Sequence, residues 1–117
     1  MQRIESLKTN RDFRRLYGRG SSFVTPLFVL YAQKTRRKDI RLGLTVGKKL
    51  GGAVARNRAK RVLRAAFRDC SPHIAAGTDF VVVARSRILN AKSTDAAVLL
   101  RRQLKAGGFW CENESAC

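Results

Sequence analysis

Residues 48–68 read KKLGGAVARNRAKRVLRAAFR, from Lys48 to Arg68, and this stretch decides the fold. From about Ala53 onward it predicts an amphipathic helix, because at roughly 100° per residue its apolar and basic side chains separate onto two faces. The apolar face holds Ala55, Ala59, Val62, Leu63, Ala66 and Phe67. The other face holds Arg56, Asn57, Lys60, Arg61, Arg64 and Arg68, with Arg58 at its flank. No carboxylate interrupts the basic face before Asp69, so the pattern predicts a polyanionic partner.

The spacing of the basic face fits a nucleic acid. Four of its side chains recur at every fourth residue: Arg56, Lys60, Arg64 and Arg68. On a helix they form a row with roughly 6 Å between neighbours, close to the phosphate spacing of a nucleic-acid backbone. Asn57 offers a donor and an acceptor to a base edge or a ribose hydroxyl, and Lys48 and Lys49 add charge just before the helix. A merely solubilising face usually mixes charges of both signs, and this one does not.

The composition supports the same reading. The formal net charge is +17, from 25 Lys and Arg against 8 Asp and Glu, while 44% of the residues are hydrophobic. We therefore predict one folded domain over residues 1–117, with a tail that frays from about residue 110, rather than a disordered basic chain. No apolar run is long enough to span a bilayer, and the N-terminus lacks an apolar secretory core. We expect a cytoplasmic protein with no membrane partner.

The rest of the chain predicts a small α+β domain. Thr9 and Asp12 form a capping pattern that starts a helix over about residues 10–17. Residues 27–32 and 41–46 are predicted strands that pair as an antiparallel hairpin across a charged turn. Residues 79–84 form a continuous apolar run typical of a central strand. A last helix is predicted from about Ser93 to the glycines at 107 and 108.

The aromatic residues divide into core and surface candidates. Phe28, Phe67 and Phe80 are predicted in the core. Phe13, Tyr17 and Tyr31 are candidates for an exposed cleft, where the bases of a single strand can stack.

The residues offer no recognisable catalytic or metal-binding set. The segment 43–49 resembles a phosphate-binding loop only faintly, because one spacer residue is missing and Lys49 stands where a hydroxyl is required. His73 is the only histidine, and the aspartates are scattered. The three cysteines, Cys70, Cys111 and Cys117, have no metal-ligand spacing and are expected as reduced thiols. By itself the polypeptide is predicted to be non-catalytic.

This basic stretch resembles the signature of the bacterial ribonuclease P protein component. The matching block runs from Lys49 through Gly52-Ala53-Val54 and Arg56-Asn57-Arg58 to Lys60-Arg61 and Arg64. Flanking segments also match, namely Leu7-Lys8, Asp12-Phe13 and residues 28–31, 41–44 and 79–85. The resemblance covers about residues 5–105.

The resemblance implies both a fold and a function. The fold would be a single small α-β-β-β-α-β-α sandwich similar to a ribosomal-protein domain, with a left-handed βαβ crossover through the basic helix. The function would be that of the protein subunit of ribonuclease P, the ribonucleoprotein that removes the 5′ leader of precursor tRNA by endonucleolytic cleavage. In this family the RNA subunit performs magnesium-dependent hydrolysis, while the protein binds that RNA and the single-stranded leader. No catalytic residue, metal or cofactor is then expected on the protein alone, and no DNA partner.

Carried over by position, the resemblance assigns two sets of site residues. The RNA-contacting set is Lys48, Lys49, Arg56, Asn57, Arg58, Lys60, Arg61, Arg64 and Arg68. The leader-binding cleft is Phe13, Tyr17 and Tyr31, where Tyr17 replaces a phenylalanine of some relatives.

Three other functional classes are weighed against this one. A ribosomal or general RNA-binding protein would bind structured RNA without any role in cleavage. A metal-dependent nuclease acting alone would need an acidic cluster that the sequence lacks. A DNA-binding helix-turn-helix module would need a second short helix just before the basic one, and residues 47–52 offer none.

Overall fold

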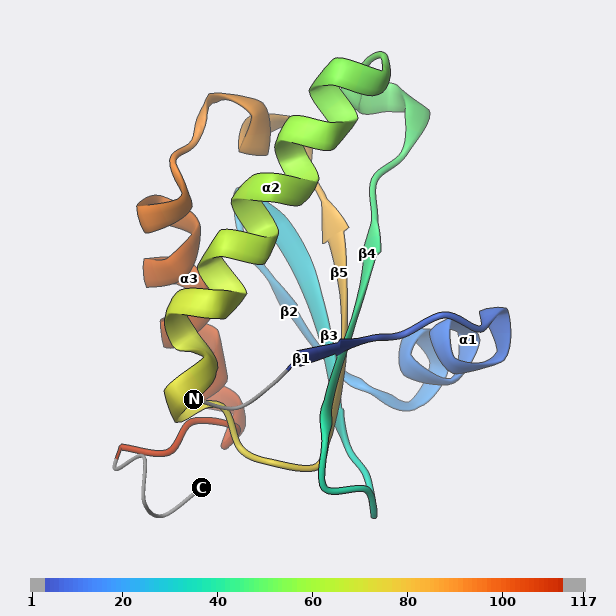
Figure 1. Cartoon of the computed structure of the whole chain (residues 1–117), viewed down its shortest axis with the longest axis vertical. Helices are drawn as coiled ribbons and strands as arrows, with labels where there is room; N and C mark the ends of the chain where they lie inside the picture. Colours follow the sequence, from blue (N-terminus) through green and yellow to red (C-terminus); the bar gives the residue numbers. More distant parts are fainter. Residues whose placement is uncertain (1–3, 113–117) are drawn as a thin grey trace.

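The computed structural model describes residues 4–112. Three helices and five strands follow one another along the chain: β1 (Ile4–Ser6), α1 (Asn10–Arg19), β2 (Ser21–Val24), β3 (Phe28–Lys34), β4 (Ile40–Thr45), α2 (Ala53–Cys70), β5 (Thr78–Ala84) and α3 (Ser93–Gly107). Three short 3₁₀ turns lie between them: η1 (Lys48–Leu50), η2 (Ser71–His73) and η3 (Ser86–Asn90). The strands form one sheet, with α2 and α3 against one face and α1 against the other (Figure 1). The predicted α+β class is confirmed.

Strand β5 occupies the centre of the sheet, whose strand order is β1-β4-β5-β3-β2. It pairs antiparallel with β3 and parallel with β4. All of its residues are buried except Val83, which is half-buried. A strand that is covered on both faces reads as a continuous apolar run, and this is why its central place could be predicted.

The predicted hairpin between the second and third long strands is wrong. β3 and β4 are not neighbours, because β5 lies between them. Their connection at residues 35–39 spans two strand spacings, roughly 10 Å, which five extended residues cross easily. The turn is instead held to the start of β5, where the amide of Thr35 donates to the carbonyl of Gly77 at 2.7 Å. The short connection therefore keeps β3 and β4 close together, but it does not require them to be hydrogen-bonded neighbours.

The chain passes from β4 to β5 through α2. These strands are parallel neighbours, and in Figure 1 both run upward with α2 to their left and β4 nearer the viewer. The crossover is left-handed, which is the uncommon hand for such a unit. It brings the basic helix back beside the edge of the sheet formed by β1 and β4.

The apolar face of α2 packs in the main core. Ala59, Val62, Leu63, Ala66 and Phe67 are all buried, whereas Ala55 in the first turn is half-buried. The ring of Phe67 meets that of Phe80 edge-on, with centroids 5.5 Å apart. Phe28 is buried in the same core. The three phenylalanines predicted in the core are thus confirmed.

The remaining boundaries follow local signals. Thr9 caps α1, since its hydroxyl accepts from the amide of Asp12 at 3.2 Å. The helix continues past Gly18 and ends at Arg19, two residues beyond the predicted end, with Gly20 as its C-cap. Helix α3 ends as predicted, because Gly108 takes a left-handed conformation with φ of 80°. The short edge strands β1 and β2 were not identified from their residues, although the family resemblance implied an additional strand.

The segment after α3 folds back onto η2. Trp110 pairs with Ile74 in an isolated bridge, and its ring stacks on His73 with centroids 4.7 Å apart. The His73 imidazole also meets the carbonyl of Cys111 at 2.8 Å, which assigns this histidine a packing role. The part of the predicted frayed tail from residue 113 lies outside the described residues.

The cysteines differ from one another. Cys70 is a buried free thiol, and burial raises its pKa to about 11, so it stays protonated at neutral pH. Cys111 is disulfide-bonded, so the expectation of a reduced thiol is wrong there. Cys117 lies outside the described residues.

Candidate nucleic-acid interface

The basic face of α2 is open. Asn57, Arg58, Arg61, Arg64 and Arg68 are exposed, as are Lys48 and Lys49 in η1, while Arg56 and Lys60 are half-buried. Within residues 4–112, the ion pairs involve other cations, and none of these side chains is paired with a carboxylate. The eight positive charges are therefore available to an external polyanion.

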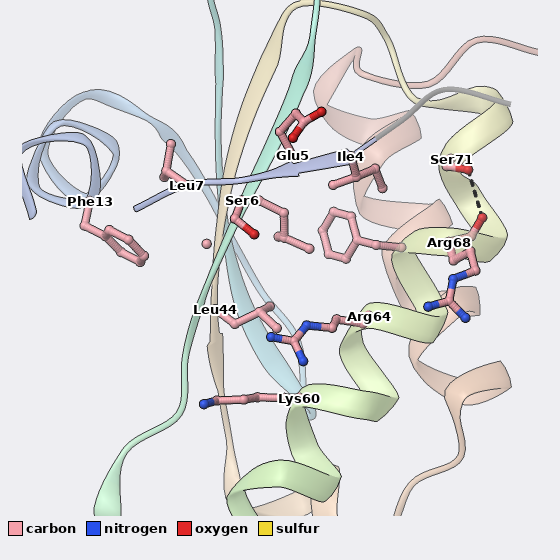
Figure 2. A pocket seen from close by; sticks show the side chains of 13 residues that line it. Ile4, Glu5, Ser6, Leu7, Phe13, Leu44, Lys60, Arg64, Arg68 and Ser71 are labelled. Carbon is pink, nitrogen blue, oxygen red and sulfur yellow. Dashed lines mark hydrogen bonds between the residues drawn. The ribbon is translucent and has the colours of Figure 1, made fainter. Parts of the chain in front are cut away.

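Different members of this face point to different surroundings. Lys60, Arg64 and Arg68 line a cavity between α2 and the edge of the sheet, and Figure 2 shows Lys60 and Arg64 extending from α2 towards β4. Arg58 leans the other way, and its Nε donates to the carbonyl of Leu89 in η3 at 3.0 Å. Three of the four residues in the row predicted from helical spacing thus face the edge of the sheet, while Arg58, at the flank of the row, contacts η3.

The three aromatic cleft candidates lie on the opposite face of the sheet, beside α1. The ring centroids of Phe13 and Tyr17 are 6.4 Å apart, and Tyr17 meets Tyr31 edge-on at 5.0 Å. Tyr17 is 41% exposed, and its hydroxyl lies 2.9 Å from Oγ1 of Thr45. A phenylalanine at this position would lack that bond, so the tyrosine ties α1 to the end of β4.

A groove of about 730 Å³ runs along this aromatic cluster. Its lining includes Phe13, Arg14 and Tyr17 from α1, together with residues 44–46 at the end of β4. Tyr31 does not line the groove; it supports the cluster from β3, packed near Val81. The structure therefore brings the three predicted residues together, with two of them at the groove surface and one behind.

Gly43 makes room for the aromatic cluster. A Cβ atom at this position would lie 2.4 Å from Cζ of Phe13, well inside van der Waals contact. The Phe13 ring thus rests directly on the backbone of β4, which only a residue without a side chain allows.

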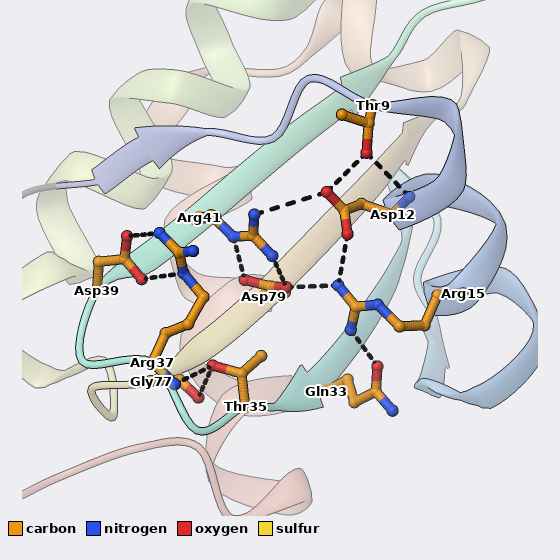
Figure 3. Close-up of polar contacts among 10 residues, drawn as sticks. All are labelled: Thr9, Asp12, Arg15, Gln33, Thr35, Arg37, Asp39, Arg41, Gly77 and Asp79. Atoms are coloured by element: carbon orange, nitrogen blue, oxygen red, sulfur yellow. Dashed lines mark hydrogen bonds and ion pairs between the residues drawn. The ribbon is translucent and has the colours of Figure 1, made fainter.

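Helix α1 is held on the sheet by a cluster of ions that the sequence did not reveal (Figure 3). The carboxylate of Asp79 is fully buried and accepts from Arg41 at 2.9 and 2.6 Å and from Arg15 at 2.6 Å. Asp12 joins the cluster through Arg15 at 3.2 Å. One signal in the sequence could have indicated this cluster. Asp79 begins the otherwise apolar run of residues 79–84, and a carboxylate buried in such a strand requires a cationic partner.

These partners shift the ionisation of the cluster. The pKa of the Asp12 carboxyl is lowered, first by the hydrogen bond from Thr9 and then by Arg15 and Arg41. The hydrogen bond to Asp79 raises the pKa of Arg41. Asp12 and Asp79 thus belong to a structural network, and no group of three or more His, Cys, Asp or Glu side chains within residues 4–112 is arranged to hold a metal ion.

Comparison with known proteins gives the family. A family model described as Ribonuclease P matches residues 1–106. The ribonuclease P protein component of Lactococcus lactis subsp. cremoris (strain MG1363) is 36% identical over 109 residues, covering 93% of this chain and 92% of that protein. That of Shouchella clausii is 41% identical over 87 residues, covering 74% and 71%. The chain belongs to the ribonuclease P protein family.

Solved structures of ribonuclease P proteins share the fold. The Staphylococcus aureus protein matches with a TM-score of 0.79 at 33% identity, covering 92% of this chain and 99% of that one. The Thermotoga maritima protein matches with a TM-score of 0.76 at 31% identity, covering 87% and 96%. The fold of this chain, with α2 crossing from β4 to β5, is therefore that of a ribonuclease P protein.

Family membership establishes the general role. The chain is an accessory protein subunit of ribonuclease P, the enzyme that processes the 5′ end of tRNA, and its partners are the RNA of that enzyme and its tRNA substrate. Within the described part of the chain, no helix combines the length and apolarity needed to cross a membrane.

Proposed function

We propose that this chain divides RNA binding between two surfaces. The basic face of α2 and the lysines of η1 bind the RNA subunit of ribonuclease P. The groove beside Phe13 and Tyr17 holds the single-stranded 5′ leader of precursor tRNA. Hydrolysis and the magnesium ions that it requires belong to the RNA subunit, so the protein acts by binding and positioning.

The observation that carries this proposal is the pairing of an open cationic helix with an aromatic groove on the other side of the sheet. Eight unpaired cations suit a folded RNA, whose phosphates are displayed on its surface. The exposed ring of Tyr17, beside the half-buried ring of Phe13, suits a single strand, whose bases are free to stack. The two surfaces thus favour two different kinds of RNA.

Binding at both surfaces would favour cleavage because it holds the substrate in a fixed position relative to the RNA subunit. Lysine and arginine release condensed counterions from RNA when they bind it. A leader held in the groove fixes the cleavage site relative to the RNA subunit, and such positioning lowers the barrier of a reaction. The bound leader also gives precursor tRNA an affinity advantage over mature tRNA, which has no leader.

The test is reconstitution of leader removal at low magnesium, with the RNA subunit in the presence and absence of this protein. We expect faster cleavage and tighter precursor binding with the protein. A ribosomal or general RNA-binding protein, the alternative function, would bind the RNA subunit and leave the cleavage rate unchanged.

The groove is tested by replacing its two rings. Phe13→Ala combined with Tyr17→Ala is expected to weaken binding of precursor tRNA by roughly 1–3 kcal/mol per lost stacking contact, while mature tRNA binds as before. Tyr17→Phe is the matched control, because it keeps the ring. Equal losses for the two substrates would contradict the assignment of the leader to the groove.

Cytoplasmic localisation and the absence of a DNA partner stay predictions of the same proposal. Competition between RNA and duplex DNA for the protein, measured at one salt concentration, tests whether DNA is a partner.

A further inference from the structure

A cavity of about 480 Å³ lies between α2 and the edge of the sheet at the end of β1 (Figure 2). Strand β1 pairs with β4 only from Ile40 to Leu42. Beyond Leu42, the outer edge of β4 has no partner strand within residues 4–112. The cavity opens at this place, and its volume is within the range of small-ligand sites.

One wall of the cavity is cationic. Lys60 and Arg64 reach into it from successive turns of α2, and Arg68 follows one turn later. In the described part of the chain, no ion pair and no side-chain hydrogen bond involves Lys60 or Arg64. Glu5 lies on β1, at the end of the cavity away from Lys60 (Figure 2). An anionic group is therefore favoured between Lys60 and Arg64.

The rest of the lining is apolar. Leu42 and Leu44 of β4 are half-buried, and Phe67 of α2 is buried behind them. A bare phosphate ion would leave these side chains uncovered. The combination fits a ligand with a flat, weakly polar ring and one attached anionic group, which describes a nucleotide.

The cavity also adjoins the aromatic groove. Phe13 and Leu44 line both, so the two hollows share a wall at the open edge of β4. A base within a duplex cannot enter, because its faces are covered by its neighbours.

We infer that this cavity binds one unstacked nucleotide of an RNA strand, with the base against Leu42 and Leu44 and the phosphate between Lys60 and Arg64. The inference rests on the proposed RNA-binding function and adds a site for a single base to it. The RNA subunit and the leader can each supply such a nucleotide, and the experiment separates these two sources.

The source is identified by ultraviolet crosslinking in the reconstituted holoenzyme with precursor tRNA bound. The RNA subunit carries an isotope label in one sample and the precursor tRNA carries it in another. We expect a nucleotide adduct on the peptides that contain residues 42–44 or Phe67, and the adduct mass names the RNA that supplies it. Adducts confined to peptides outside the cavity would overturn the inference.

The second arm fills the cavity without removing a charge. Ser6 lies on β1 beside Leu42 and lines the cavity, so Ser6→Trp places a ring where the base would lie. Ser21→Trp is the matched control, because Ser21 is exposed on β2 at the opposite edge of the sheet. We expect Ser6→Trp to weaken binding of the RNA named by the adduct by about tenfold or more, and Ser21→Trp to change it by less than about twofold.

These outcomes separate the cavity from the proposed function. If the unsubstituted chain fails to bind the RNA subunit, the proposed function fails, and the cavity assignment fails with it. If that chain binds RNA and Ser6→Trp binds equally well with an unchanged melting temperature, the cavity assignment alone is wrong. The crosslinking arm uses the unsubstituted chain, so it decides the matter even if Ser6→Trp does not fold.

Discussion

At the scale of single residues, the site depends on groups that the fold leaves unpartnered. Nε of Arg56 is buried and has no hydrogen-bond partner within residues 4–112. A buried donor without a partner costs free energy in the isolated protein. An RNA phosphate or carbonyl that accepts from it would remove that cost, so this arginine is expected to contribute strongly to binding.

Arg56→Ala is therefore expected to lower the affinity for the RNA subunit by roughly 1–3 kcal/mol, because a charge-assisted hydrogen bond is lost. The measurement is a binding titration at fixed salt. Arg102→Ala is the control, since Arg102 is an exposed arginine on α3, away from the basic face. An equal loss in the two variants would indicate a nonspecific effect of charge.

Gly43→Ala is expected to displace the Phe13 ring, because the new methyl group would overlap it. The atoms that must move belong to the packed ring of Phe13, so we expect a stability loss of about 1–3 kcal/mol. The preference for precursor over mature tRNA should also fall. Gly47→Ala serves as the control, because a Cβ there meets nothing within 4 Å. An unchanged preference in Gly43→Ala would show that the position of Phe13 does not matter for the leader.

At the scale of elements, the decisive feature is the attachment of α1 to the sheet. The helix contributes Arg15, β4 contributes Arg41, and β5 contributes the buried Asp79 between them (Figure 3). Three elements that are distant in sequence therefore meet at one carboxylate. This cluster fixes the helix that carries Phe13 and Tyr17, so it acts on the groove through position.

Asp79→Asn is expected to destabilise the fold by about 3 kcal/mol, because it leaves two guanidinium groups without their buried counter-charge. It should also reduce the preference for precursor tRNA, since α1 is held less firmly. Thermal unfolding and the two tRNA affinities measure these effects. Asp39→Asn is the control, because Asp39 pairs with Arg37 at the surface and should leave the melting temperature nearly unchanged.

Asp12 gives the attachment of α1 a pH dependence. Its pKa in the folded chain is lowered from 3.8, first by the Thr9 hydrogen bond. A carboxyl with a lowered pKa stabilises the fold above its unfolded pKa, and this contribution is lost as the pH falls through the folded value. We expect the difference in melting temperature between the wild type and Asp12→Asn to be present at neutral pH and to vanish well below pH 3.8. Thr9→Ala should shrink that difference, and a difference independent of pH would contradict this account.

At the scale of the whole molecule, charge dominates. A net charge of +17 on 117 residues opposes folding through self-repulsion and favours RNA binding. The sheet places the two surfaces back to back, with the basic helix on one face and the aromatic groove on the other (Figure 1). One small domain can thereby contact a folded RNA and a single strand together.

Binding of the RNA subunit is expected to weaken steeply with salt. Each single-strand phosphate contact contributes about −0.7 to the slope of log affinity against log salt, so the six cations of the basic face and the two lysines of η1 together set a limit near −6. Titrations over a range of KCl concentrations measure the slope. Arg56→Ala should make it shallower by about one contact, and an unchanged slope would remove Arg56 from the interface.

Much of this protein followed from its sequence because the signals are local. The two faces of α2, the cap at Thr9, the stop at Gly108 and the apolar run of β5 each depend on residues close together in the chain. The family resemblance rests on the same basic stretch. Helix bounds, the core phenylalanines and the family were therefore predictable.

Strand pairing and the ion cluster were decided only by the tertiary structure. The turn at residues 35–39 permits β3 and β4 to be partners, and it also permits a strand between them. Strand β5 takes the place between β3 and β4, because a strand that is apolar on both faces is stabilised most where both of its faces are covered. In the same way, nothing local joins Arg15, Arg41 and Asp79, because each arginine pairs with Asp79 only once the fold has brought it within 3 Å of that carboxylate. Contacts between distant segments depend on the free energy of the whole chain in each competing arrangement. No single stretch of sequence determines that free energy.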